Sequence, residues 1–194
     1  GFPINTSSNM PSFFKRRISE ITGVVILSIV FLMATALLTY NASDISLNTA
    51  NSEPILNFMG VPGALLSDLL LQTIGLTNIA LLSVLSFWGF RFLTHRAVNK
   101  LLLRLLLLPC GLIVLSSAIT SIPNPSFWYL NSTIGGVIGS IFFDQIILWV
   151  EPFIINSHIV SLLLALSGLL ILFWCLGAGW KDWTKVIVGI SQQL

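Results

Sequence analysis

The chain has 194 residues, of which 55% are hydrophobic and only 8% are charged, and its mean hydropathy is +0.95. Soluble domains carry about 25% charged residues, so this composition excludes a water-soluble domain and indicates a membrane protein. The net charge of +2 comes from the ends of loops and excludes a nucleic-acid-binding surface, which needs a dense basic face.

The first half of the chain predicts a membrane span, a polar loop, a short helix and a second span. The apolar run 18–40 is long enough to cross a hydrocarbon core of about 30 Å, and the polar residues 41–59 follow it. The next apolar stretch is too long to cross upright, and Gly75 offers a break within it. We therefore predict a short re-entrant or interfacial helix at 63–74 and a span at 76–93.

The second half predicts the same order of elements. A third span covers 101–122 and contains Pro109, which should kink it. After a second polar loop, another overlong apolar stretch is broken at Pro152. We predict a short helix at 139–151 and a fourth span at 157–180. The predicted fold is an all-α integral membrane protein with four transmembrane helices and two short re-entrant or interfacial helices on the outer side.

The basic residues fix the predicted topology. All nine fall into three clusters, before the first span, around the connection between the second and third, and after the fourth: Lys15, Arg16, Arg17, Arg91, Arg96, Lys100, Arg104, Lys181 and Lys185. Because cytoplasmic loops collect Lys and Arg, both termini and the middle loop are placed in the cytoplasm. This predicts a cytoplasmic segment at 1–17, a four-span membrane domain at 18–185 and the start of a cytoplasmic linker at 186–194.

The two short helices begin with similar sequences. At a single offset, two glycines, a valine and an aspartate coincide: Gly60, Val61, Gly63 and Asp68 with Gly136, Val137, Gly139 and Asp144. The same offset roughly superposes the first span on the third and the second on the fourth. Since both halves begin and end on the same side, we predict a parallel internal repeat of pseudo-repeated halves.

Asp68 and Asp144 are the two carboxylates to single out, because each lies near the membrane in a short helix. Intramembrane carboxylates often mark an ion or proton pathway. The alternative is an amphipathic helix whose acid faces the aqueous outer side. The absence of a basic residue inside the bilayer segments favours this alternative.

The glycines near the short helices form a second candidate set. Gly135 and Gly139 have the small-xxx-small spacing that lets backbones approach closely, and Gly60 and Gly63 resemble it less clearly. We expect a role in helix packing or subunit contacts, or simply in turns.

The sequence contains no motif for catalysis. There is no phosphate-binding loop, dinucleotide-binding turn, zinc-protease motif or nucleophile elbow. We therefore expect no catalytic, cofactor-binding or metal-binding residue in this chain, and no enzymatic activity.

Residues 13–185 resemble the four-span N-terminal membrane domain of the FtsK/SpoIIIE DNA translocase family. The resemblance rests on Asn41-Ala42-Ser43-Asp44 after the first span, on the blocks 60–68 and 135–140 at the short helices, and on the aromatic, glycine-rich exit 174–183. Ala42 departs from the family pattern, which usually has Pro there.

The resemblance implies a bacterial inner-membrane protein at the division septum. In that family a linker joins the membrane domain to a cytoplasmic hexameric ATPase that pumps DNA. The implied role is a membrane anchor and assembly module that self-associates, as a hexamer in the full protein, and contacts divisome membrane proteins. No cofactor is expected here, because ATP, Mg and DNA would bind only the motor domain, which is absent from this sequence.

The alternative is a small multi-pass transporter or channel subunit. Re-entrant helices, a parallel repeat and two carboxylates at membrane level would suit it, but the spans hold no polar stripe. The gene beyond Leu194 distinguishes the two: a long linker and a phosphate-binding loop would favour the translocase, and a stop codon the transporter.

Overall fold

The computed structural model describes residues 12–46, 54–96, 98–128, 130–153 and 156–177. Within these ranges helices are the only regular secondary structure, with no strand, and four helical segments are long and apolar enough to cross a membrane. This confirms the predicted all-α membrane fold. Lys181, Lys185 and the expected linker at 186–194 lie outside the described residues, as does most of the predicted cytoplasmic segment 1–17.

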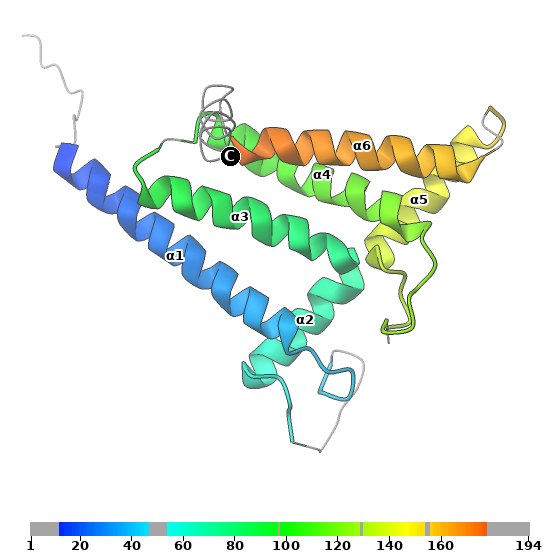
Figure 1. The fold of residues 1–194 in the computed structure, drawn as a ribbon, viewed down its shortest axis with the longest axis horizontal. Helices are drawn as coiled ribbons and strands as arrows, with labels where there is room; N and C mark the ends of the chain where they lie inside the picture. The colour runs from blue at the N-terminus through cyan, green and yellow to red at the C-terminus, as the bar shows by residue number, and fades with distance from the viewer. Residues whose placement is uncertain (1–11, 47–53, 97, 129, 154–155, 178–194) are drawn as a thin grey trace, which may run out of the picture.

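Each half consists of a long helix, a short helix and a second long helix (Figure 1). The elements are α1 (Ser12–Leu38), α2 (Gly60–Ile74), the 3-10 helix η1 (Gly75–Thr77), α3 (Asn78–Leu93), α4 (Leu101–Thr120), α5 (Gly136–Val150) and α6 (Ser157–Leu176). Gly75 separates α2 from α3, since its φ of +56° cannot continue a right-handed helix. Pro109 lies inside α4. After α5 the chain turns through Glu151–Phe153 before α6 begins.

The long helices pair within each half, α1 against α3 and α4 against α6 (Figure 1). Glycines permit these close approaches. A Cβ atom on Gly23 of α1 would lie 2.6 Å from the backbone nitrogen of Leu93, and one on Gly168 of α6 would lie 2.9 Å from that of Leu115. The helix pairs are therefore held by direct backbone contact as well as by side-chain packing.

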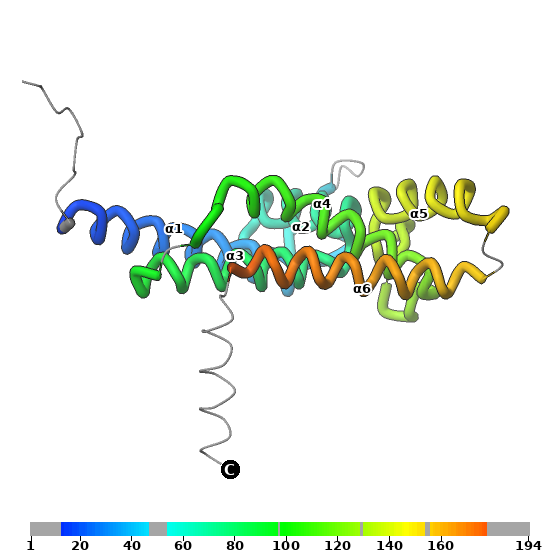
Figure 2. The backbone as a smooth tube through the Cα atoms, turned by 90° about the horizontal axis from the view of Figure 1, so that it is seen from above, coloured from blue at the N-terminus to red at the C-terminus, as the bar shows by residue number. Residues whose placement is uncertain are grey.

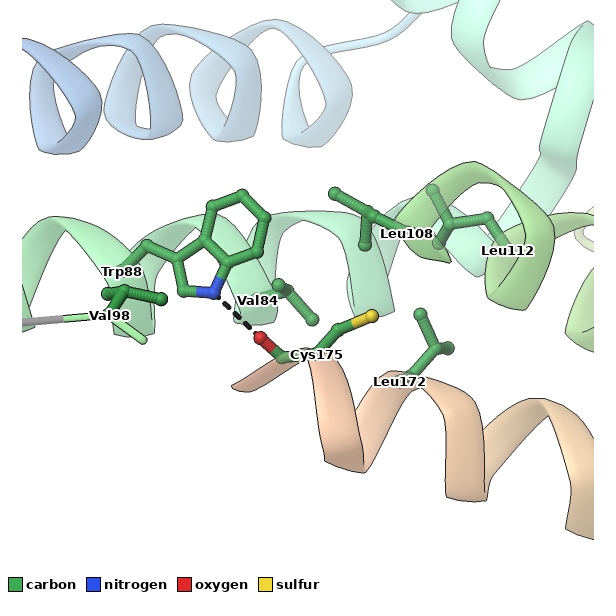
Figure 3. Packing of buried hydrophobic residues seen from close by; sticks show 7 residues of the cluster. All are labelled: Val84, Trp88, Val98, Leu108, Leu112, Leu172 and Cys175. Atoms are coloured by element: carbon green, nitrogen blue, oxygen red, sulfur yellow. Dashed lines mark hydrogen bonds between the residues drawn. The ribbon is translucent and has the colours of Figure 1, made fainter. Parts of the chain in front are cut away.

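The two halves meet at both ends of the long helices. At the end that carries the basic residues, α3, α4 and α6 enclose a buried cluster: Val84, Trp88, Val98, Leu108, Leu112, Leu172 and Cys175 (Figure 3). The indole nitrogen of Trp88 donates to the carbonyl oxygen of Cys175 at 2.8 Å. At the opposite end, α2 packs against α5.

The molecule is flat, and α1 lies at one edge of it, packed against α2 and α3 (Figures 1 and 2). Many large apolar side chains point outward; on α6, Leu162, Leu166 and Leu169 are each more than half exposed. Such apolar faces are unfavourable in water and suit contact with lipid.

Candidate functional site

Four buried polar residues gather where α1 ends and α2 begins, at the end of the molecule opposite the basic residues. They are Asp44, Asn57, Ser67 and Asp68, each at most 5% exposed, and we call them the outer polar cluster. Buried polar groups are costly unless they are hydrogen-bonded, so their partners determine what the cluster can do.

Asp44 closes the loop between α1 and α2. Its carboxylate oxygens accept hydrogen bonds from the backbone nitrogens of Leu56, at 2.7 Å, and Asn57, at 2.9 Å. The preceding Asn41 side chain accepts from the backbone and hydroxyl of Ser43 and forms a local turn. The carboxylate thus joins the start of the loop to its end, twelve residues later.

Asn57 then fixes α1 to α2. Its amide nitrogen donates to the carbonyl oxygens of Ala36, at 2.9 Å, and Thr39, at 3.3 Å, which lie at the end of α1. These carbonyls have no partner within the helix, so Asn57 satisfies groups that would otherwise be exposed in an apolar region. Ser67, which is fully buried, lies 3.5 Å from the same nitrogen and donates to the carbonyl of Gly63.

Asp68 has only neutral hydrogen-bond donors among its described partners. It accepts from the hydroxyl of Tyr40, at 3.3 Å, and from the amide nitrogen of Gln72, at 2.9 Å to each oxygen. Burial, and then the nearby Asp68 carboxylate, raise the pKa of Tyr40 from 10.0 to about 12. The expectation that this acid faces water is wrong for Asp68, because Tyr40 and Gln72 cover it. Asp144, at the equivalent position of the repeat, is exposed.

A cavity of about 340 Å³ lies beside Asp68, between the two halves. Tyr40, Asp44 and Asp68 line it from the first half, and Asn131 and Ser132 from the second. Both carboxylates already accept hydrogen bonds, and the described part of the chain contains no group of three or more His, Cys, Asp or Glu residues that could hold a metal ion. The hydrogen bonds of this arrangement thus fix the loop after α1 against the end of α1 and the start of α2.

Gly75 and Gly136 lie where the end of α2 meets the start of α5. The backbone nitrogen of Leu76 donates to the carbonyl of Ile134 at 2.8 Å. A Cβ on Gly75 would lie 2.6 Å from the carbonyl carbon of Ile134, and one on Gly136, whose φ is +75°, would lie 2.7 Å from the nitrogen of Ile74. No side chain fits at Gly75 or Gly136 without displacing the backbone opposite.

The other candidate glycines have different surroundings. Gly135 and Gly139 pack on Ser116 of α4, whose hydroxyl donates to the carbonyl of Gly135. Gly63 packs on the side chain of Asn57. Gly60 has a φ of +64° and open space around it. The two glycine pairs therefore differ: Gly135 and Gly139 contact a neighbouring span, and Gly60 serves a turn.

The described basic residues lie at one end of the molecule, at the start of α1 and around the α3–α4 connection (Figure 1). They are Lys15, Arg16, Arg17, Arg91, Arg96, Lys100 and Arg104. Arg91 is buried, whereas Arg96 and Lys100 are exposed. Arg104 donates to the carbonyls of Asn99, at 2.6 Å, and Trp174, and its guanidinium lies 4.6 Å from the centre of the Trp174 ring.

Reasoning from sequence did not identify Asn57 or Tyr40 as members of a polar cluster. The one sequence signal near this cluster is the block Asn41–Asp44, which indicates a family resemblance but no polar cluster. Asn57 is one of several polar residues in a polar loop, and nothing local distinguishes it.

Residues 15–184 match the family described as the 4TM region of DNA translocase FtsK/SpoIIIE. The chain belongs to the FtsK/SpoIIIE family. It therefore contains the membrane region of an FtsK DNA translocase, and the helices α1 to α6 described above, with their four candidate membrane spans, are the architecture of that region in this chain.

Several proteins named DNA translocase FtsK are similar to this chain. The protein of Bradyrhizobium diazoefficiens is 34% identical over 124 residues, which is 64% of this chain and 15% of the relative. That of Agrobacterium fabrum is 32% identical over 67% of this chain and 15% of the relative. That of Azospirillum brasilense is 26% identical over 93% of this chain and 30% of the relative. The FtsK region thus spans less than a third of these relatives. No solved structure matches this chain.

Proposed function

We propose that this chain is the membrane anchor and assembly module of an FtsK-like cell-division DNA translocase. The observation that carries the proposal is the position of the basic residues. The start of α1, the α3–α4 connection and the end of α6 share one end of the molecule (Figure 1). A motor domain following α6 would then lie on the same side of the membrane as the N-terminus.

In this proposal the basic end faces the cytoplasm of the bacterial inner membrane, because Lys and Arg are retained on that side. Residues 1–17 and 186–194 are the cytoplasmic flanks of a membrane domain at 18–185. Lys15, Arg16, Arg17, Arg91, Arg96, Lys100, Arg104, Lys181 and Lys185 are the topology determinants. The outer polar cluster and its cavity then face the periplasm.

The proposed partners follow from the same arrangement. Exposed apolar faces on α1 and α6 are available to lipid, to further copies in a hexameric translocase and to divisome membrane proteins at the septum. ATP, Mg and DNA would be bound by the motor domain alone. The glycines that bring α5 onto α4 act in packing within the subunit, and we assign no catalytic role to Asp68 or Asp144.

Reporter fusions test the orientation. A reporter that is active only in the periplasm is fused after Asn99, between α3 and α4, or after Asn124, between α4 and α5. We expect activity only for the Asn124 fusion. Activity at Asn99 with none at Asn124 would contradict the cytoplasmic placement of both ends.

Localisation and transport assays test the anchor role. A fluorescent fusion of residues 1–194 should concentrate at the division septum, and the purified chain should neither hydrolyse ATP nor bind DNA. A dispersed fusion together with solute flux through liposomes containing the chain would instead support a small transporter or channel subunit.

A further inference from the structure

A groove of about 530 Å³ lies between α1 and α3 at the basic end of the molecule. Lys15, Arg16, Ile18 and Thr22 line it from α1, and Phe92 and His95 line it from the end of α3 and the turn that follows. The hydroxyl of Ser19 donates to the carbonyl of Phe92 at 2.6 Å, which holds the two helices together at its floor.

The positive charge of this groove is not neutralised by the described residues. Glu20 is the one described acid at this end, and it is shared by Arg17, at 2.7 Å, and His95, at 3.2 Å. Lys15 and Arg16 are exposed and form no ion pair with any residue that the structure describes. Two free cations therefore border the groove.

The floor of the groove is apolar, and its position fits the surface of a bilayer. Ile18 is half exposed, and Phe92 lies beside it in the groove. Phe13 and Phe14, in the first turn of α1, expose 61% and 57% of their surface. These apolar rings lie next to cations at the start of a membrane span, where hydrocarbon meets headgroups.

We propose that this groove binds an anionic phospholipid. The headgroup phosphate lies between Lys15 and Arg16, and the start of the acyl chains lies on Ile18 and Phe92. Basic pockets between transmembrane helices bind anionic headgroups in this way, because charge and apolar contact act together. A soluble phosphate would use only the rim of the groove, whereas the lipid uses the rim and the floor.

The test measures lipid binding to the purified, delipidated chain by native mass spectrometry and by thermal stabilisation. The wild-type chain should bind phosphatidylglycerol and be stabilised by it, with no comparable effect of phosphatidylcholine or inorganic phosphate. The double variant Lys15→Gln/Arg16→Gln should bind phosphatidylglycerol about 30-fold more weakly, since each basic residue near an anionic surface contributes about a factor of five.

The matched control is Arg96→Gln/Lys100→Gln, which removes the same charge from exposed residues of the α3–α4 connection outside the groove. Its affinity for phosphatidylglycerol should fall much less than that of Lys15→Gln/Arg16→Gln. Equal losses in the two double variants would overturn the proposal in favour of general electrostatic attraction. Stabilisation by inorganic phosphate equal to that by phosphatidylglycerol would overturn it in favour of a soluble anion.

A second variant tests the apolar floor without changing any charge. Thr22→Trp fills the groove, because the Thr22 hydroxyl bonds only to the carbonyl of Ile18 in its own helix. It should reduce phosphatidylglycerol binding, whereas Ile29→Trp, at an exposed position of α1 outside the groove, should not. Unchanged binding in Thr22→Trp would exclude this groove as the site.

Discussion

The indole nitrogen of Trp88 in α3 donates a hydrogen bond to the carbonyl oxygen of Cys175 in α6, 2.8 Å away (Figure 3). Cys175 lies in the last turn of its helix, where carbonyls lack a partner within the helix. Both residues are at most 3% exposed. One side chain of the first half thus satisfies a buried backbone group of the second.

Trp88→Phe removes this donor and leaves the Cys175 carbonyl buried without it. We expect the free energy of unfolding to fall by about 1–3 kcal/mol, the cost of an unsatisfied buried polar group. Unfolding in mixed micelles with increasing denaturing detergent measures the loss. Trp149→Phe is the control, because Trp149 is 79% exposed on α5. Equal stability of the two variants would show that the hydrogen bond contributes nothing.

The contact between the end of α2 and the start of α5 gives a second prediction. Gly136→Ala and Gly60→Ala both place a Cβ on a residue with positive φ, which costs about 1–2 kcal/mol. Gly136→Ala also forces the Cβ against the backbone of Thr73 and Ile74, which adds about 1–3 kcal/mol of overpacking. Thermal unfolding in detergent should show a clearly lower midpoint temperature for Gly136→Ala than for Gly60→Ala. The reverse order would contradict the close approach described here.

The loop between α1 and α2 gives a third prediction. Asp44→Asn keeps the size of the side chain but replaces one of the two carboxylate oxygens by a donor, which then faces the backbone nitrogen of either Leu56 or Asn57. We expect a loss of about 1–3 kcal/mol in the free energy of unfolding. Asp144→Asn, at an exposed position, should change stability by no more than about 0.5 kcal/mol. Both are measured by the same thermal unfolding assay. Similar effects of the two changes would argue against a stabilising role of the hydrogen bonds that Asp44 accepts from Leu56 and Asn57.

Tyr40 gives a prediction about pH. Its phenol has a pKa of about 12 in the folded protein against 10.0 when unperturbed, so the fold favours the neutral form. The stabilisation is complete below about pH 10 and is lost as the pH rises toward about 12. Tyr129→Phe leaves Tyr40 as the only tyrosine, so ultraviolet absorbance follows its ionisation.

In that background, Asp68→Asn should lower the pKa of Tyr40, because it removes the neighbouring negative charge. A titration near 10 before any substitution at Asp68, or no response to the substitution, would contradict the contact between these two side chains.

The helical fold was predictable from sequence because each span lies in a long apolar run, and Gly75 is a strong local break between the first short helix and the span that follows it. The outer polar cluster was not predictable from sequence. Asp68 and Asp144 occupy equivalent positions of similar sequences, yet one is buried and the other exposed. One partner of Asp68 is Tyr40, which lies 28 residues before it and reaches it only in the folded chain.

The contact between Gly75, Ile134 and Gly136 is made by main-chain atoms. Exchanging one lipid-facing leucine for another apolar residue elsewhere in the helices leaves those atoms where they are. The spans can therefore change in sequence while the contact between the two halves keeps its geometry, provided that neither glycine acquires a side chain.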